Sequence, residues 1–231
     1  MSQLLFLIPP SEGKARGGLA GNQHISFALE RPSEIACNAS EKDLKCSGKR
    51  YAEAIALNRS LDHTPVLPAI ERYSGVMYQA IGYARLQEEE KRFFDEHFLI
   101  MSGMYGLLRP QDQIANYKLP IASKGLYAFW GEKIIKQLTA FQAYTIVSLL
   151  PDEYLKLITG RSLQKARAGF EGQLIQLKFL DEQGKRLTHH SKPIKGQWIR
   201  AITQLTLSSQ KDIQRLLQLP GYHIEAIPLL P

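Results

Sequence analysis

Three short, largely apolar runs most constrain what this chain can fold into. They cover residues 4–8, 97–102 and 144–150. Runs of this length that lack a regular alternation of polar and apolar residues predict strands covered on both faces. Strands of that kind are typical of sheets that carry helices on both sides. The chain therefore predicts an α/β fold with a central mixed sheet flanked by helices.

Apolar residues at helical spacing occupy most of the intervals between these runs. Glu182-Gln183-Gly184 is typical of a hairpin turn between residues 172–180 and 185–190, and residues 223–227 predict a last strand. We find no internal repeat and no long linker, so we expect a single domain over residues 1–231. The predicted helices cover residues 33–61, 69–81, 84–96, 125–138, 193–206 and 209–217.

The net positive charge of the chain limits the classes of partner that it is expected to bind. With 231 residues, 44% of them hydrophobic, the chain has the material for a sizeable core, and its net charge is +7. A basic surface favours nucleic acid, an anionic membrane or phosphorylated small molecules, although it can also serve solubility alone. No run approaches the ~20 apolar residues of a membrane span. Because Cys37 and Cys46 form no C-x-x-C pair and no targeting segment is visible, we expect a cytoplasmic protein that does not bind membranes.

Polar side chains follow each of the three apolar runs. Lys14 comes after the first, Arg109 and Asp112 after the second, and residues 152–154 after the third. If the strands are parallel neighbours, their carboxyl ends share one edge of the sheet, where α/β proteins place their ligands. The sequence therefore predicts a ligand site at this edge, without by itself specifying a reaction.

A basic helix start adds to this predicted site. Lys192 and Lys195 lie in its first turns, and Gly196 and Arg200 lie off its apolar stripe. Cations are disfavoured by the helix dipole at that end unless an anion lies between them and the helix amides. Gly196 would let another group approach the helix backbone. We interpret the segment as an anion site; a solvated basic face is the alternative.

Other sequence motifs give weaker evidence for a function. His189 and His190 are adjacent on a predicted strand and point to opposite faces, so they do not form a metal site. We find no ligand set for zinc or iron and expect no cofactor. Residues 103–106 have the G-x-x-G spacing of a KH loop, but they follow a strand rather than joining helices. Ser102 and Ser148 lack a histidine partner in sequence context, so the sequence does not support a nucleophilic triad.

Five segments occur along the chain in this order: IPPSEGK, YSGVMYQAI, MSGMYGLLRPQDQIANYKLP, LYAFWGEKI and SKPIKGQWIRAI. Together they resemble the YaaA peroxide-stress family. The resemblance covers most of the chain and implies the unusual α/β fold, cytoplasmic location and nucleic-acid binding attributed to that family. It also implies a role in hydrogen peroxide resistance through limiting unincorporated iron.

The resemblance also implies particular site residues. Where the family often has N-L-A-S-x-E-Y, this chain reads SLLPDEY, which retains Glu153 and Tyr154 but leaves no clear role for Ser148 or Pro151. The other positions that match the family are Lys14, Arg109, Asp112, Tyr117, Lys192, Lys195 and Arg200.

Our leading hypothesis is a peroxide-response protein that binds nucleic acid, with duplex DNA contacted through its phosphate backbone. The contacting residues would be Lys14, Arg109, Lys192, Lys195 and Arg200. The alternative is an enzyme acting on a nucleotide or another phosphorylated small molecule, in which Glu153 or Asp112 serves as general base. Direct sequestration of iron is the weakest option because no ligand set is visible.

Overall fold

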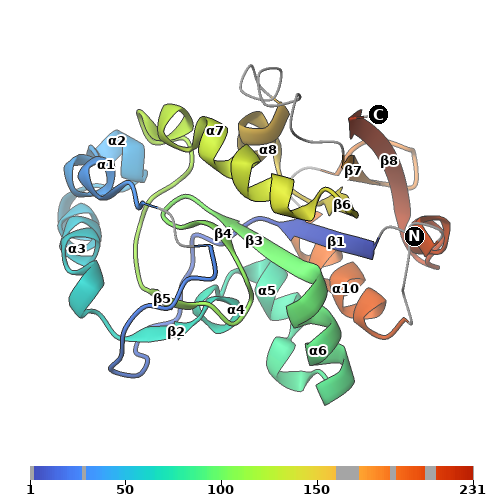
Figure 1. Cartoon of the computed structure of the whole chain (residues 1–231), viewed down its shortest axis with the longest axis horizontal. Coiled ribbons are helices and arrows are strands. Elements are labelled where there is room, and N and C mark those ends of the chain that lie inside the picture. Colours follow the sequence, from blue (N-terminus) through green and yellow to red (C-terminus); the bar gives the residue numbers. More distant parts are fainter. Residues whose placement is uncertain (1–2, 28–29, 160–171, 188–190, 206–211, 231) are drawn as a thin grey trace.

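A six-stranded sheet runs through the centre of the protein (Figure 1). The computed structural model describes residues 3–27, 30–159, 172–187, 191–205 and 212–230. The strand order within these residues is β4-β3-β1-β6-β7-β8. The strands are β1 (Gln3–Ile8), β3 (Phe98–Ser102), β4 (Gly106–Leu108), β6 (Tyr144–Ser148), β7 (Gln173–Leu180) and β8 (His223–Leu230).

The predicted mixed sheet is confirmed, and its middle is parallel. β1 lies between β3 and β6 and runs parallel to both, and β7 runs parallel to β6. The outer strands β4 and β8 are antiparallel to their neighbours. Residues 4–8 of β1 are at most 1% exposed, as expected for a strand covered on both faces.

Helices lie on both sides of β1, so the prediction of flanking helices is confirmed (Figure 1). On one side are α5 (Val76–Ile81), α6 (Glu88–His97) and α10 (Ser191–Thr203). On the other are α7 (Leu126–Leu138) and α8 (Asp152–Thr159). The remaining described elements are α1 (Ser33–Asn38), α2 (Glu41–Leu44), α3 (Gly48–Arg59), α4 (Ala69–Arg72), α11 (Ile213–Leu217) and the two-stranded sheet of β2 (Val66–Pro68) and β5 (Gln113–Ala115).

Several predicted boundaries were wrong. The helix predicted over residues 33–61 is broken into α1, α2 and α3. At the start of α2, Asp43 completes a capping box with Ser40, the role usually taken by glutamate or glutamine. The helix predicted over residues 69–81 is interrupted between α4 and α5. The hairpin turn after β7 is present, but the ladder partner of β7 is β8. Residues 188–190 of the predicted second hairpin strand, including His189 and His190, lie outside the described residues.

Gly196 marks the contact between α10 and α5. A Cβ at this position would lie 2.3 Å from the carbonyl oxygen of Met77 and 2.7 Å from Cβ of Ala80. The group that approaches the backbone at Gly196 is therefore helix α5, and not a ligand. Helices can come this close only where one of them lacks a side chain.

We expect Gly196→Ala to destabilise the protein by about 1–3 kcal/mol, because the added methyl group must push α10 and α5 apart. The corresponding drop in melting temperature is roughly 2–12 °C for a chain of this size. Gln197→Ala, at the exposed next position of α10, is the matched control. Thermal unfolding followed by circular dichroism measures both, and equal melting temperatures would contradict this packing account.

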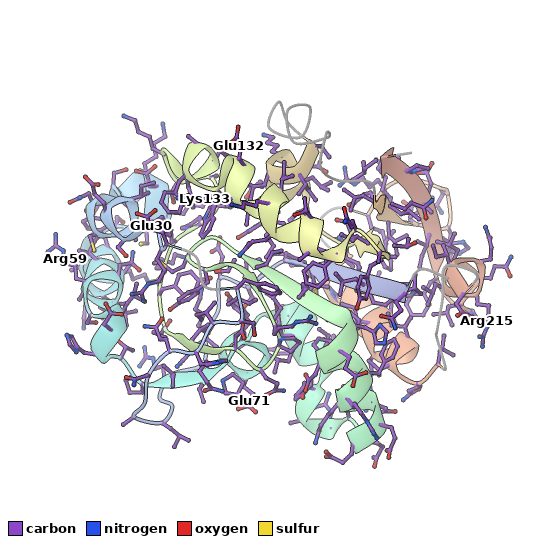
Figure 2. The ribbon with its side chains drawn as sticks, viewed as in Figure 1. Glu30, Arg59, Glu71, Glu132, Lys133 and Arg215 are labelled. Atoms are coloured by element: carbon purple, nitrogen blue, oxygen red, sulfur yellow. The ribbon has the colours of Figure 1, made fainter. Side chains whose placement is uncertain are left out.

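Charged side chains lie mostly on the outside of the protein. Figure 2 shows Arg59, Glu132 and Arg215 directed away from the ribbon core. Lys133 and Glu30 form one of the exposed ion pairs, with 3.3 Å between Nζ and Oε2. Within the described ranges, every helix is too short or too polar to cross a membrane.

Candidate functional site

A pocket opens at the carboxyl end of the central strand β1. The chain passes from β1 to β3 on one side and later to β6 on the other, which makes the end of β1 a topological switch point. The pocket has a volume of about 350 Å³. Its walls come from the loop after β1, the start of α5, the segment after β5, the start of α8 and the start of α10.

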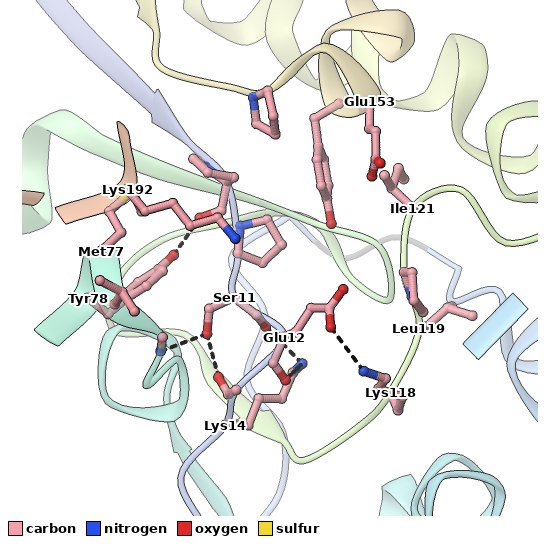
Figure 3. A pocket seen from close by; sticks show the side chains of 18 of the residues that line it. Ser11, Glu12, Lys14, Met77, Tyr78, Lys118, Leu119, Ile121, Glu153 and Lys192 are labelled. Atoms are coloured by element: carbon pink, nitrogen blue, oxygen red, sulfur yellow. Dashed lines mark hydrogen bonds and ion pairs between the residues drawn. The ribbon is translucent and has the colours of Figure 1, made fainter. Parts of the chain in front are cut away.

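Five of the residues predicted from the sequence line this pocket together. They come from four separate parts of the chain, which the sheet topology brings to one place (Figure 3). The structure therefore brings these five residues together, whereas the expected convergence of Lys14 with Arg109 and Lys195 is absent, and the function of each residue stays a prediction. The five residues are Lys14, Tyr117, Glu153, Tyr154 and Lys192.

Lys14 is held in place by its own loop. The amide of Ala15 donates to the carbonyl of Arg72 at 2.8 Å, and the amide of Ser74 donates to that of Gly13 at 3.0 Å. These bonds fix the loop against the end of α4. The Lys14 ammonium then donates to the carbonyl oxygen of Ser11 at 3.1 Å and lies 4.2 Å from the ring centroid of Tyr117.

Burial makes Lys14 an unusual lysine. Its acceptors are backbone carbonyls, and within the described residues it forms no ion pair with a carboxylate. Burial, with repulsion from Lys118 and Arg72, lowers the pKa of Lys14 to about 7, although the carboxylate of Glu12 opposes this shift. Removal from water therefore outweighs the attraction of the aromatic ring beneath the ammonium. A large fraction of the amine is neutral at physiological pH.

A chain of hydroxyl groups supports the ring below Lys14. The Tyr117 hydroxyl lies 2.8 Å from the hydroxyls of both Tyr73 and Ser102. Ser102 also accepts the amides of Met104 and Tyr105, each at 3.1 Å. Burial raises the pKa of Tyr117 to about 12, so its phenol stays protonated. Ser102 thus fixes the turn after β3 and positions Tyr117.

Replacing Lys14 by methionine should raise the melting temperature most at low pH. In the folded state the pKa of Lys14 is about 7, and its ordinary value is 10.5. Below pH 7 both folded and unfolded states carry the charge, so the folded state bears the full cost of burying it. Between pH 7 and 10.5 the folded state loses its proton first, and stability rises with pH.

Lys14→Met should therefore gain more over the wild type at pH 6 than at pH 9. Differential scanning calorimetry at both values measures the gain. Lys136→Met, at an exposed position of α7, controls for the loss of a surface charge. A gain at pH 9 that equals or exceeds the gain at pH 6 would show that Lys14 is not desolvated as the structure indicates.

Lysines also surround the mouth of the pocket. Lys118 pairs with Glu12 at 3.3 Å (Figure 3), and Lys45 approaches Glu153 at 3.8 Å. Burial alone would raise the pKa of Glu12, but the neighbouring Lys118 outweighs it and lowers the pKa, so the carboxylate is ionised. Lys192 is exposed on the far side of the pocket from Lys118. Because both glutamates are more than half exposed, these pairs are weak and can exchange for other anions.

A second hollow continues from the first along α3. Both hollows include Lys14, Lys45 and Lys118, and the second reaches Arg50. Glu12, Glu53 and Glu153 are the acidic residues of these walls. Cations thus outnumber carboxylates over an elongated surface. We refer to its cationic residues, Lys14, Lys45, Arg50, Lys118 and Lys192, as the basic groove.

Tyr154 contributes a polar group without a partner to the pocket. Its side chain is only 9% exposed, and its hydroxyl makes no hydrogen bond to the residues that the structure describes. Burial, with the nearby Tyr117 and Glu153, raises the pKa of Tyr154 well above its ordinary value. A buried phenol that keeps its proton is a donor available to a ligand.

The expected position of Arg109 was wrong. Strand β4 runs antiparallel to β3, so the chain returns to the end of the sheet where β1 and β6 begin. Arg109 therefore lies near Gln3 and Tyr144, at the amino ends of β1 and β6. Its guanidinium donates to the carbonyl of Glu96 at 3.1 Å, so it does not reach Lys14.

Asp112 has a structural role at the same end of the sheet as Arg109. It is 2% exposed and accepts the backbone amides of Arg109 at 2.8 Å and Ser26 at 3.1 Å. Burial raises its pKa, although these hydrogen bonds oppose the shift. Asp112 fixes the turn after β4 and lies away from the pocket, so it is no longer a candidate for the general base.

Lys195 and Arg200 also lie outside the pocket lining. The Lys195 ammonium donates to the carbonyl of Leu149 at 2.8 Å and connects α10 to the loop after β6. Burial, with repulsion from Arg186, lowers the pKa of Lys195 to about 8. Arg200 reaches the carbonyl of Ile81 at 3.4 Å, at the carboxyl end of α5. Both cations therefore satisfy backbone carbonyls at the ends of other elements.

Sequence reasoning missed three cations of the groove. Lys118 directly follows the predicted Tyr117, and that adjacency was the available signal. Lys45 and Arg50 lie between the loop after β1 and the segment after β5, far along the chain from both, and no local pattern connects them to the site. Lys45 is also the described non-glycine residue with positive φ, at 53° after α2, a conformation that the chain tolerates at a cost.

The fold and pocket define an α/β protein with a lysine-lined site at the end of its central strand. A family model described as peroxide stress protein YaaA matches residues 4–227. This chain belongs to that family. It is 37% identical over 173 residues to a UPF0246 protein of Finegoldia magna, covering 74% of this chain and 69% of the relative. It is 33% identical over 174 residues to a UPF0246 protein of Lactobacillus delbrueckii subsp. bulgaricus, covering 71% and 68%.

Proposed function

We propose that this cytoplasmic protein acts in the peroxide response by binding nucleic acid, with duplex DNA held through its phosphate backbone along the basic groove. One observation carries the proposal. Five basic residues from the loop after β1, the α2–α3 region, the segment after β5 and α10 line two adjoining hollows, and all of them except the partly neutral Lys14 are cations. An elongated row of cations is better suited to binding a polyanion than to binding a single phosphate group.

The chemistry of the groove favours phosphate contacts over base recognition. Lysine ammonium groups act as point charges and do not form the bidentate contacts that read base edges. The ion pairs with Glu12 and Glu153 are exposed, so a phosphate can replace either carboxylate at little cost. Binding should therefore tolerate many sequences and weaken steeply with salt.

Fluorescence anisotropy with a labelled duplex tests this proposal over a series of salt concentrations. We expect log affinity to fall linearly with log salt, with a slope of about −0.9 for each phosphate contacted. Two duplexes of unrelated sequence should bind with similar affinity. Absent binding at low salt, or an affinity that does not change with salt, would contradict the proposal.

The enclosed part of the groove favours a second candidate, an enzyme that acts on a nucleotide or another phosphorylated small molecule. Its specific support is the pocket of about 350 Å³, which contains a partly neutral amine at Lys14 and a proton-donating phenol at Tyr154. Glu153 would serve as the general base. A thermal-shift screen with nucleotides separates the two candidates, since a tight small ligand must raise the melting temperature.

We place the limitation of free iron in the same proposal, as an indirect result of nucleic-acid binding. The residues described here contain no group of three or more histidine, cysteine, aspartate or glutamate side chains that could hold a metal ion. Equilibrium dialysis with ferrous iron measures direct retention. Retention of one iron per chain would contradict this indirect effect and show that the protein sequesters iron itself.

A further inference from the structure

The pocket contains a lysine, Lys14, that is better suited to act as a nucleophile than to bind a phosphate by its charge. The amine of Lys14 donates to the backbone carbonyls of Ser11 at 3.1 Å and Glu12 at 3.5 Å, and to no carboxylate among the described residues. A lysine that only bound phosphate would be better placed at the mouth, in water, where it keeps its charge. A lysine amine that burial keeps neutral is the form that attacks carbonyl carbons.

The second feature is the unpartnered phenol of Tyr154 in the same pocket. The residue is 91% buried, but its hydroxyl is not one of the fully enclosed atoms without a partner, so it stays accessible from the pocket. Formation of an imine needs a proton donor, because the hydroxyl of the intermediate must leave as water. Tyr154 keeps its proton and has no other described use for it. The phenol is therefore a fitting donor for this step.

The third feature is the ring of cations above Lys14. Lys118 and Lys192 lie on opposite sides of the mouth (Figure 3), and Lys45 lies within 3.8 Å of Glu153. A ligand whose carbonyl group reached Lys14 would place any substituent at the mouth among these ammonium groups. A phosphate is the substituent that such a ring favours. This step rests on the phosphate affinity of the groove proposed above.

We propose that Lys14 forms a reversible imine with a phosphate-bearing aldehyde that enters this pocket. The neutral amine adds to the aldehyde carbon and gives a carbinolamine. Tyr154 protonates the departing hydroxyl, water leaves, and the nitrogen loses its proton as the C=N bond forms. No oxidant or reductant takes part, and hydrolysis restores the amine. The aldehyde can be a free sugar phosphate or an abasic deoxyribose in a nucleic acid strand.

The rate of imine formation should follow the ionisation of Lys14. The charged and titratable groups that face this amine are Glu12 on its own loop, Lys118 after β5, Arg72 of α4, and the phenols of Tyr73 and Tyr117. With a pKa of about 7, half of the amine is neutral at pH 7. The neutral fraction of an ordinary surface lysine at that pH is smaller by about three orders of magnitude.

Pyridoxal 5′-phosphate serves as the probe for the full-length protein. Borohydride reduces the imine to a stable secondary amine, and peptide mass spectrometry locates it. We expect labelling at Lys14 before any other lysine, half-maximal in rate near pH 7, and absent in Lys14→Arg. Tyr154→Phe should slow labelling by roughly tenfold or more, whereas the distant control Tyr144→Phe should not. Labelling confined to other lysines would overturn the inference, and this readout needs no variant.

Comparison with unphosphorylated pyridoxal tests whether the imine site requires a phosphate group. Preference for the phosphorylated probe supports this requirement, and equal labelling of Lys14 by both probes overturns it, whereas the salt series with duplex DNA tests the proposed function separately. Salt-steep duplex binding without labelling at Lys14 overturns the imine alone. Borohydride trapping with glyceraldehyde 3-phosphate and with a duplex containing an abasic site identifies the source of the aldehyde. Failure of both to react at Lys14 overturns the proposed ligand class.

Discussion

Replacement of Arg72 by methionine should destabilise this protein by about 3–5 kcal/mol, the cost of breaking a fully buried charged network. Arg72 is 0% exposed, and its guanidinium donates to four backbone carbonyls. These carbonyls belong to three segments that surround the site. Methionine would fill part of the space but would remove the hydrogen bond that Arg72 donates to each of the four acceptors. The acceptors are Ala15, Gly17, Pro65 and Ile114.

Thermal unfolding measures this effect, and we expect the melting temperature to fall by roughly 10 °C for a chain of this size. Arg72→Lys should also destabilise, because an ammonium group cannot reach four acceptors in the directions that the guanidinium serves. Arg59→Met is the matched control, since Arg59 is exposed at the end of α3 (Figure 2). Equal melting temperatures for the Arg72→Met and Arg59→Met variants would show that the network contributes little.

The second large effect concerns the basic groove. A variant with Lys45, Lys118 and Lys192 all changed to glutamine should bind duplex DNA more weakly by one to three orders of magnitude at ~0.1 M salt. Each lysine that contacts a phosphate adds about one unit to the slope of log affinity against log salt. The slope should therefore become shallower by up to about three units. Both effects arise because fewer counterions are released from the DNA.

The matched control is a variant that loses the same charge elsewhere. Lys91, Lys136 and Lys185 are exposed or half-buried residues of α6, α7 and the turn after β7, and none of them lines the groove. Changing these three to glutamine lowers the net charge equally. If both triple variants lose the same affinity and slope, DNA responds to overall charge, and the groove is not the site.

The core of the fold could be predicted from local sequence pattern. Residues 4–8, 98–102 and 144–148 form parallel strands because continuous apolar runs are stable only when both faces are covered. Strand β4 could not be found in this way, since the three residues Gly106–Leu108 are too few to show a period. That omission moved Arg109 and Asp112 to the wrong edge of the sheet, because an antiparallel return reverses the direction of the chain.

The site was predictable only where its residues follow strands. Lys14 and Glu153 lie in the pocket because β1 and β6 are parallel neighbours whose ends share an edge. Lys45 and Arg50 come from outlying helices, whose position depends on tertiary packing that no local spacing reveals. The pKa of Lys14 was equally out of reach, since it follows from the loss of water around one amine.

Lysine footprinting tests the central claim of nucleic-acid binding most directly. The protein is treated briefly with an acetylating reagent, with and without a saturating duplex, and mass spectrometry measures the modification of each lysine. We predict that the duplex protects Lys45, Lys118 and Lys192 and leaves Lys91 and Lys136 unchanged. Equal modification of the three groove lysines with and without bound duplex would contradict the claim.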